Sequence, residues 1–198
     1  ADYSQELAVT DAITILDHLK IKSAHIIGLS MGGFTAVHMG LEYSERCNSL
    51  CVAGCGYGAE KKYEEYFKGV SLEVAKNFEE KGAREFAKIY SLGASRVQFQ
   101  NKNPRGWLEF AQRLAEHSSQ GSAFTMRGVQ ARRPSLYDLE EELRSMSVPT
   151  LIVNGDEDDH CLQVGLYLKK VIPASGLLVL PKTGHTLNLE VPEVFNSA

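Results

Sequence analysis

The sequence predicts an α/β protein built on a parallel β-sheet. Short apolar runs alternate with amphipathic helical segments along the chain, an order that is typical of parallel sheets with helical crossovers. The run at residues 24–29 is apolar apart from His25, as expected for a strand covered on both faces. The 198 residues are enough for one domain with a core and an inserted subdomain.

The first elements are a helix over residues 2–20 and the strand at 24–29. Ser4 is placed to cap the helix, since serine side chains accept from the free N–H groups of a first turn. The apolar positions of this helix recur at helical spacing and are expected to form one buried face. They are Val9, Ala12, Ile13, Leu16 and Leu19.

A sharp turn with the pattern Gly28-x-Ser30-x-Gly32 joins this strand to a helix predicted over residues 31–41. Strand, turn and helix form the context in which such a serine is an exposed nucleophile. Side chains at the flanking glycines are expected to collide with neighbouring backbone. The N–H of Met31 is predicted to lie where an oxyanion forms, at a positive helix end. The alternative interpretation of the pattern alone is an ordinary Gly-Ser loop.

A helical insertion is predicted after the second strand, at residues 50–53, and the glycine-rich loop at 54–58. That loop does not match a phosphate-binding fingerprint, because no helix-opening glycine follows at the right place. Charged helical patterns then succeed one another without a convincing strand, and their charged faces are interpreted as solvated. The predicted helices are 60–68, 72–81, 83–90, 104–116, 123–130 and 137–146. The sequence therefore divides into core residues 1–58, the insertion 59–146 and core residues 147–198.

The remaining elements restore the alternation of strand and helix. A strand is predicted at residues 150–154, a helix at 162–170 and a last strand at 177–180. An acidic turn at 156–159 follows the first of these strands, and His185 lies in the loop after the last.

Composition excludes several classes of partner. The formal charge of −4 gives no electrostatic case for nucleic acid or an anionic membrane, and no apolar run approaches bilayer-spanning length. The four cysteines form no Cys-x-x-Cys pair, and no histidine cluster completes a zinc site. Cys51 is expected to be a buried free thiol, which favours a reducing, cytoplasmic setting. No cofactor and no metal are implied.

Three strand ends carry the residue types of nucleophilic catalysis. A serine hydroxyl needs a histidine to accept its proton and a carboxylate to orient that histidine. Ser30, an acid within residues 156–159 and His185 follow three strands, and such ends meet at one edge of a parallel sheet. The other histidines are interpreted as structural or exposed. They are His18, His25, His38, His117 and His160, of which the last is close enough to the acidic turn to be confused with the base.

In three stretches the chain resembles the α/β-hydrolase family: residues 25–33, 148–158 and 183–193. The resemblance implies that Asp158 is the acid, with Asp156 and Asp159 as alternatives, and that His185 is the base. It also makes the helical insertion the family's cap. A serine at the nucleophile position implies acyl chemistry, whereas epoxide hydrolases and haloalkane dehalogenases of the family carry aspartate there.

Three functions follow as hypotheses. The first is a carboxylesterase-like serine hydrolase acting on a small ester, lactone or thioester, with Ser30, His185, Asp158 and the Met31 N–H as its machinery. The second is an acyltransferase or carbon–carbon bond hydrolase using the same residues. The third is a non-catalytic binding module or an incomplete fragment. Arg132 and Arg133 are predicted to be a solvent-exposed pair, with contact to an anionic substrate as the alternative.

The resemblance also predicts what this stretch of chain lacks. In the family, the first strands and the loop supplying the second oxyanion donor precede the first helix seen here, so a partial fold with an open apolar sheet edge is expected. Either a missing N-terminal segment or a second copy of the chain is expected to complete the sheet. The 198-residue piece alone is expected to be poorly soluble or weakly active.

Overall fold

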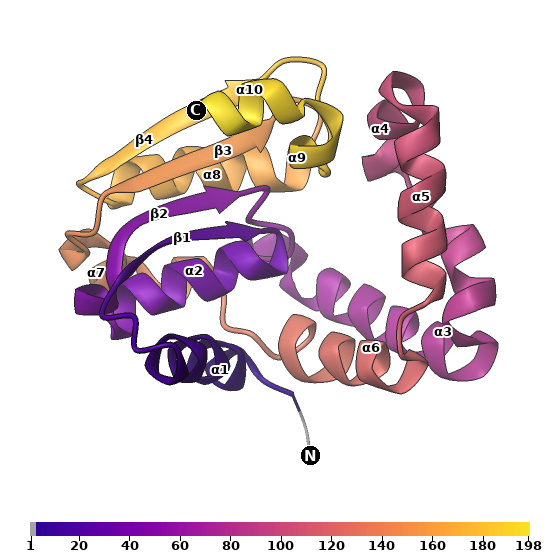
Figure 1. The fold of residues 1–198 in the computed structure, drawn as a ribbon, viewed down its shortest axis with the longest axis horizontal. Coiled ribbons are helices and arrows are strands. Elements are labelled where there is room, and N and C mark those ends of the chain that lie inside the picture. Colours follow the sequence, from indigo (N-terminus) through magenta and orange to yellow (C-terminus); the bar gives the residue numbers. More distant parts are fainter. Residues whose placement is uncertain (1–2) are drawn as a thin grey trace.

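The computed structural model describes residues 3–198, which contain a four-stranded parallel sheet in the order β1-β2-β3-β4 (Figure 1). Its strands are β1 (Ala24–Leu29), β2 (Cys47–Ala53), β3 (Thr150–Gly155) and β4 (Ser175–Leu180). The predicted α/β class and parallel sheet are confirmed. Each predicted strand is present, and the second and fourth begin earlier than their apolar cores indicate.

The strand register brings the carboxyl ends together. Leu29 pairs with Ala53, Ala53 pairs with Val153, and Gly155 pairs with Leu180. The loops that follow these residues therefore leave the sheet at one edge, as they must in a parallel sheet.

One face of the sheet carries α1 (Gln5–His18), α2 (Met31–Glu42) and α8 (Asp159–Val171) around the main hydrophobic core. Ser4 caps α1 by accepting from the Leu7 N–H at 3.1 Å, as predicted. The helix is shorter than the predicted 2–20, and Asp2 lies outside the described residues. Leu19 is the C-cap and is mostly exposed, because the chain leaves the helix before this side chain reaches the core.

The segment between β2 and β3 consists of helices and connecting loops, with no strand. Its longest helical stretch, α3 (Glu64–Tyr90), covers three predicted helices and is kinked at Gly82, whose φ of 75° and ψ of 160° are non-helical, so the predicted break between residues 81 and 83 is present. The other α-helices are α4 (Val97–Lys102), α5 (Pro104–Ala115), α6 (Ser119–Thr125) and α7 (Glu140–Ser145). Its shorter turns are η2 (Lys61–Tyr63), η3 (Ala94–Arg96), the π-helical η4 (Met126–Gln130) and η5 (Leu136–Leu139). A further short turn, η1 (Ser44–Arg46), lies before this segment, between α2 and β2.

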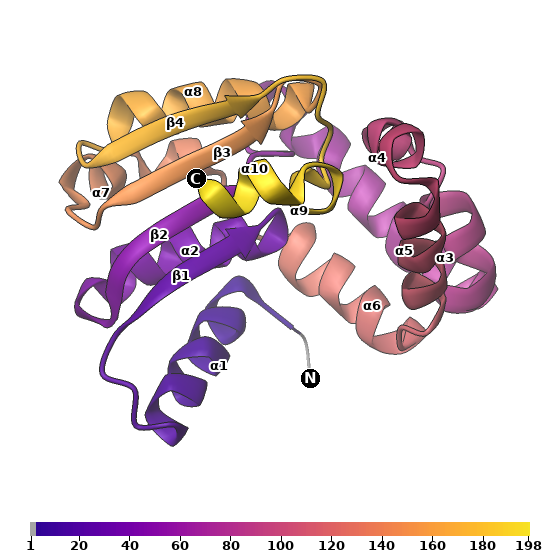
Figure 2. The same ribbon diagram turned by 45° about the horizontal axis from the view of Figure 1, so that its top comes forward.

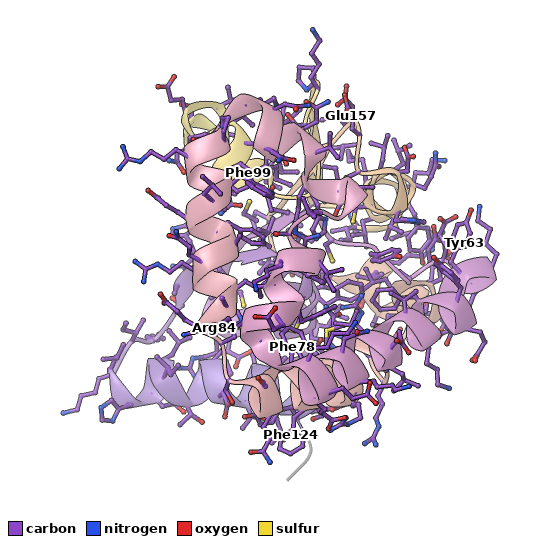
Figure 3. All side chains as sticks on the ribbon, turned by 90° about the vertical axis from the view of Figure 1, so that its right-hand side faces the viewer. Tyr63, Phe78, Arg84, Phe99, Phe124 and Glu157 are labelled. Atoms are coloured by element: carbon purple, nitrogen blue, oxygen red, sulfur yellow. The ribbon has the colours of Figure 1, made fainter. Side chains whose placement is uncertain are left out.

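Helices α3, α5 and α6 have a small core of their own beside the carboxyl ends of the strands (Figure 2). Phe78 and Phe86 meet edge to face across the bend in α3, with ring centroids 4.9 Å apart. Figure 3 views this side of the molecule, with Phe78 and Phe99 among the helices. The helical segment therefore lies next to the edge where the three loops leave the sheet.

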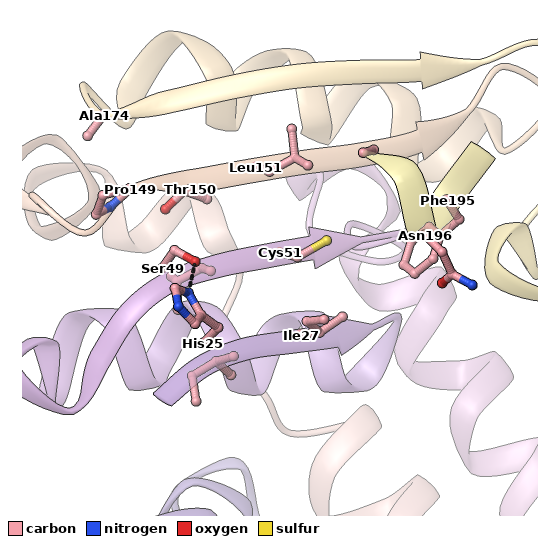
Figure 4. Close-up of a pocket in the computed structure, with 13 residues that line it drawn as sticks. His25, Ile27, Ser49, Cys51, Pro149, Thr150, Leu151, Ala174, Phe195 and Asn196 are labelled. Atoms are coloured by element: carbon pink, nitrogen blue, oxygen red, sulfur yellow. Dashed lines mark hydrogen bonds between the residues drawn. The ribbon is translucent and has the colours of Figure 1, made fainter. Parts of the chain in front are cut away.

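The other face of the sheet is only partly covered, by α9 (Leu187–Glu190) and α10 (Pro192–Ser197). The open part is a cavity of about 530 Å³. Figure 4 shows its lining, with Phe195 and Asn196 at one end and Ala174 at the other. Ile27 is 68% exposed there, so the prediction that β1 is covered on both faces is wrong in this structure. Cys51 lies on the same face and is half-buried, although free as predicted. None of the helices in residues 3–198 combines the length and apolarity needed to cross a bilayer.

Candidate active site

Ser30 lies at the tight turn between β1 and α2. Its φ of 54° and ψ of −115° are unusual for a residue with a side chain, and such backbone strain is concentrated at functional sites. Hydrogen bonds hold the turn from both sides: the Ser30 N–H donates to the Ala53 carbonyl at 2.8 Å, and its carbonyl accepts from the Gly33 N–H at 2.9 Å.

Two glycines near Ser30 leave no room for a side chain, and only one of them, Gly28, belongs to the predicted pair of Gly28 and Gly32. A Cβ on Gly28 would lie 2.0 Å from the Gly32 carbonyl oxygen, so that part of the prediction is confirmed. At Gly32 a Cβ would meet nothing within 4 Å, so the predicted collision there is wrong. Instead Gly33 is confined, because its Cβ would lie 2.7 Å from the Cβ of Cys55. Helix α2 therefore packs on the loop after β2 through Gly33.

Asp158 is the N-cap residue of α8, and its side chain is buried. Its Oδ2 lies 2.7 Å from Nδ1 of His185. The two alternative acids are placed elsewhere. Asp156 accepts from the Thr183 N–H at 3.1 Å, and backbone N–H groups lower its pKa. Asp159 is exposed in the first turn of α8.

His185 connects the acid to the serine. Its Nε2 lies 2.8 Å from Ser30 Oγ, on the opposite side of the ring from Asp158. A carboxylate only accepts, so Nδ1 carries a proton that it donates to Asp158, and the neutral ring is left with Nε2 as an acceptor for the Ser30 hydroxyl. Met31 is the first residue of α2, where a backbone N–H has no acceptor within the helix.

Glu190 is a buried carboxylate that the sequence analysis does not single out. It accepts from the Gly184 N–H at 2.8 Å, the Thr186 N–H at 3.1 Å and the Thr186 hydroxyl at 2.9 Å. Lys102 provides its counter-ion, with Nζ 3.9 Å from Oε2. These bonds hold the residues on both sides of His185. The only signal in the sequence is that an acidic residue follows the histidine by five positions. This spacing is informative only when α9 is known to bring Glu190 back to the His185 loop.

The helical segment is bonded directly to the loops that carry Asp158 and His185. The His185 N–H donates to the carbonyl of Ser95 at 3.2 Å. Lys102 donates to the Thr183 hydroxyl at 3.2 Å, and Gln98 donates to the Glu157 carboxylate at 2.7 Å. The position of His185 is therefore linked to η3 and α4.

A cavity of about 440 Å³ lies between the helical segment and Ser30. Its wall is largely apolar and includes Phe67, Val70, Val74, Phe86 and Ile89 of α3. His160 also lines it, with its ring 4.4 Å from that of Tyr57 and 5.5 Å from that of Tyr63. Its ring is thus packed among aromatic side chains, whereas His185 is the histidine that contacts Ser30.

Arg133 lines the same cavity and is not the solvent-exposed residue that the sequence analysis predicts. Its guanidinium lies 3.6 Å from the ring centroid of Phe34. It donates to the Tyr57 carbonyl at 2.5 Å and also to the Gln130 side chain. Burial lowers its pKa to about 10. Arg132 is exposed, as predicted.

Cys161 brings a buried thiol close to His185. Its Sγ lies 3.3 Å from the Gly54 carbonyl and 3.9 Å from His185 Nδ1, and burial raises the pKa of the thiol well above its usual value. Within the described part of the chain, one group of side chains could hold a metal: Asp158, Cys161 and His185, whose ligand atoms lie within 4.8 Å of one another. Two of these three residues are already bonded to each other.

Comparison with known proteins gives one family. A family model described as the alpha/beta hydrolase fold matches residues 1–192. A 3-oxoadipate enol-lactonase of Acinetobacter baylyi is 30% identical over 186 residues, which cover 93% of this chain and 65% of the relative. A 2-hydroxy-6-oxononadienedioate/2-hydroxy-6-oxononatrienedioate hydrolase of a Pseudomonas species is 29% identical over 187 residues, which cover 92% of this chain and 63% of the relative. The chain thus spans slightly less than two thirds of these proteins.

Among solved structures, that of MenH from S. aureus superposes with a TM-score of 0.88. The match covers 100% of this chain and 74% of the other, at 22% sequence identity. At that identity the likeness describes the fold.

Proposed function

The chain belongs to the α/β hydrolase fold family, and from that premise we propose that it is a serine hydrolase cleaving a carboxylic ester or lactone at Ser30. One observation carries the proposal. Ser30, His185 and Asp158 form a continuous line of hydrogen bonds of 2.8 and 2.7 Å at a cavity of about 440 Å³. Their mutual geometry matches a nucleophile, a base and an orienting acid.

In the proposed reaction the Ser30 Oγ attacks the carbonyl carbon while His185 Nε2 accepts the hydroxyl proton. Asp158 stabilises the resulting imidazolium through Nδ1. The Met31 N–H, with the positive end of α2, stabilises the oxyanion. His185 then gives the proton to the leaving alkoxide, and an acyl group remains on Ser30. Water, deprotonated by the same nitrogen, attacks this acyl group and releases the acid.

The substrate class rests on the cavity and on the relatives. A mostly apolar cavity of this size fits a small molecule. The enol-lactonase relative acts by name on a lactone, which favours an ester or lactone as the bond cleaved. We assign the helical segment at residues 59–146 the role of a cap that selects the substrate, because α3 supplies much of the cavity wall. No cofactor or metal enters this mechanism.

Carbon–carbon bond hydrolysis is the second candidate. The relative named 2-hydroxy-6-oxononadienedioate/2-hydroxy-6-oxononatrienedioate hydrolase favours it, and the same three side chains are available for either reaction. Product analysis separates the two, since ester cleavage releases an acid and an alcohol. Acyl transfer would instead show as capture of the acyl group by an added alcohol or thiol in preference to water.

Labelling with a fluorophosphonate probe tests the proposal. We expect one adduct at Ser30 on the full-length protein, and loss of both labelling and p-nitrophenyl ester hydrolysis in Ser30→Ala. Ser71→Ala is the matched control, since Ser71 lines the same cavity without a hydrogen-bond partner among the described residues. Full activity of Ser30→Ala would refute the proposal, and failure of the wild type to react with probe or esters would favour a binding module.

The compartment is a separate part of the proposal. All four cysteines are free thiols in the structure. Two of them are fully buried: Cys55 lies against Gly33, in the first turn of α2, and Cys161 lies beside His185. Free thiols in these positions fit a reducing compartment, and we assign the protein to the cytoplasm on that basis. The partner we propose is a small ester-like molecule.

A further inference from the structure

The charge of the cavity wall is unbalanced. Among the residues that line it, Asp158 is the one carboxylate, and it is bonded to His185. Two arginines, Arg96 and Arg133, line the same cavity. The wall therefore presents positive charge that its own residues do not neutralise.

Arg133 lacks a carboxylate partner among the described residues, for its hydrogen bonds go to a carbonyl and to an amide. Both are neutral acceptors, and the faces of Phe34 and Phe67 lie 3.6 and 4.8 Å from its guanidinium carbon. Partial burial of a cation without a counter-ion is unfavourable. Its pKa of about 10 still leaves Arg133 charged at neutral pH.

Arg133 is also close to the reacting serine. Phe34, over which it stacks, is in the first turn of α2, and the Phe34 N–H donates to the Ser30 carbonyl at 3.3 Å. Tyr57, whose carbonyl Arg133 holds, lines the cavity as well. An anion bound at Arg133 would lie in the same cavity as the ester bond attacked by Ser30.

Arg96 provides an independent observation. Its Nε is buried and has no hydrogen-bond partner within residues 3–198. Its guanidinium lies 4.3 Å from the ring centroid of Tyr90, and one terminal nitrogen donates to the Ser95 hydroxyl at 2.9 Å. A buried, unpaired charged donor is costly, and a substrate oxygen would relieve that cost.

We propose that the substrate is an anionic ester or lactone, and that Arg133 binds its carboxylate while Ser30 attacks the acyl carbon. Arg96 of η3, which lines the same cavity, contributes to the same preference. This proposal rests on the proposed serine hydrolase function. It adds a charged group to the substrate class and assigns the residue that selects it.

A matched pair of substrates tests the assignment on the full-length protein. Adipic acid mono-p-nitrophenyl ester carries a carboxylate, and p-nitrophenyl hexanoate is its neutral analogue of equal chain length. We expect kcat/KM to be higher for the anionic ester. In Arg133→Met it should fall by about 10- to 100-fold for that ester, mostly through KM, because a hydrogen bond to a charged group contributes roughly 1.5–3 kcal/mol. The neutral ester should change by less than about threefold.

Two further variants separate charge from structure. Arg133→Lys keeps the charge without the planar fork and should recover part of the preference. Arg132→Met alters the exposed neighbour and should leave the preference intact. Equal losses for both esters in Arg133→Met would mean that Arg133 only holds the loop at Tyr57, and would overturn the proposal.

A binding measurement keeps this test independent of turnover. Calorimetric titration of Ser30→Ala with adipate should show binding that is lost when Arg133→Met is added. A wild type that hydrolyses both esters equally well refutes the anionic substrate but leaves the hydrolase proposal standing. A wild type that binds adipate through Arg133 but cleaves neither ester refutes the hydrolase and retains the anion site.

Discussion

At the scale of single residues, the assignment of the acid depends on where three neighbouring aspartates point. Asp158 contacts His185, Asp156 contacts a backbone N–H, and Asp159 is in an exposed turn of α8. An asparagine at the orienting position presents an amide that can stabilise the wrong tautomer of the histidine, which removes the acceptor from Nε2.

We therefore predict that Asp158→Asn lowers kcat by about 10⁴, judging from the same substitution in a serine protease triad. Asp159→Asn is the matched control and should stay within about twofold. Steady-state kinetics with a p-nitrophenyl ester, together with circular dichroism to verify folding, measures both. A larger loss in Asp159→Asn than in Asp158→Asn would move the acid to the other position.

The sequence predicts that Ser30, Asp158 and His185 lie together, as they do in the structure, because its signals are local. A glycine-flanked serine after an apolar strand, an acidic turn after another strand and a Gly-His pair after the last one are each readable within ten residues. Arg133 is different, since its environment depends on Phe34 and Tyr57, which are distant in sequence. A pair of consecutive arginines before a proline is typical of exposed turns, and only tertiary packing buries one of them.

At the scale of elements, two short segments control the loop that carries His185. Helix α9 folds back so that the Glu190 carboxylate bonds to Gly184 and Thr186 on either side of the histidine. Helix α4 supplies Lys102 to the same carboxylate. Neither helix is predicted from the sequence, because segments of four and six residues carry too little periodicity to be recognised. The break between the predicted helices 72–81 and 83–90 is present, because Gly82 has non-helical φ and ψ of 75° and 160° inside α3.

Glu190→Gln should lower kcat about tenfold with little change in KM. Glutamine has the same shape as glutamate, but one of its two terminal atoms is an NH2 group, which cannot accept a hydrogen bond. The loop that carries His185 therefore loses at least one charge-assisted hydrogen bond. We also expect a lower melting temperature, consistent with a loss of about 1–3 kcal/mol.

Glu193→Gln, at an exposed position three residues further on, is the control for this change. Kinetics and thermal unfolding are to be measured on both variants. A Glu190→Gln protein with unchanged kcat and a lowered melting temperature would show that the carboxylate stabilises the fold without positioning His185.

At the scale of the whole molecule, the sheet is apolar on both faces but covered fully on one. Ile26 packs towards the main core, whereas Ile27 is 68% exposed on the opposite face. The apolar pattern of residues 24–29 predicts burial on both sides. The helices α9 and α10 cover only part of this face, where Leu187 packs with Ala53, Val153 and Leu180 in a small buried cluster.

Ile27→Thr should leave the melting temperature of the 198-residue chain unchanged and reduce its aggregation, since it removes apolar surface from solvent-exposed sheet. Ile152→Thr, at a fully buried position of β3, should cost on the order of 2 kcal/mol or more. Thermal unfolding and light scattering measure both. Destabilisation of the Ile27 variant in proportion to protein concentration would reveal that a second copy covers this face.

The hydrogen bond from the His185 N–H to the Ser95 carbonyl has a consequence for protein engineering. Exchanging helical insertions between relatives is an obvious way to transplant substrate preference. A graft cut at residues 59 and 146 would also remove Ser95, and with it the acceptor that holds the backbone of His185. A working chimaera must therefore place another backbone carbonyl where that of Ser95 lies. The insertion taken from the relative has to be chosen first by its backbone conformation at the position of η3, and only then by the side chains that line its cavity.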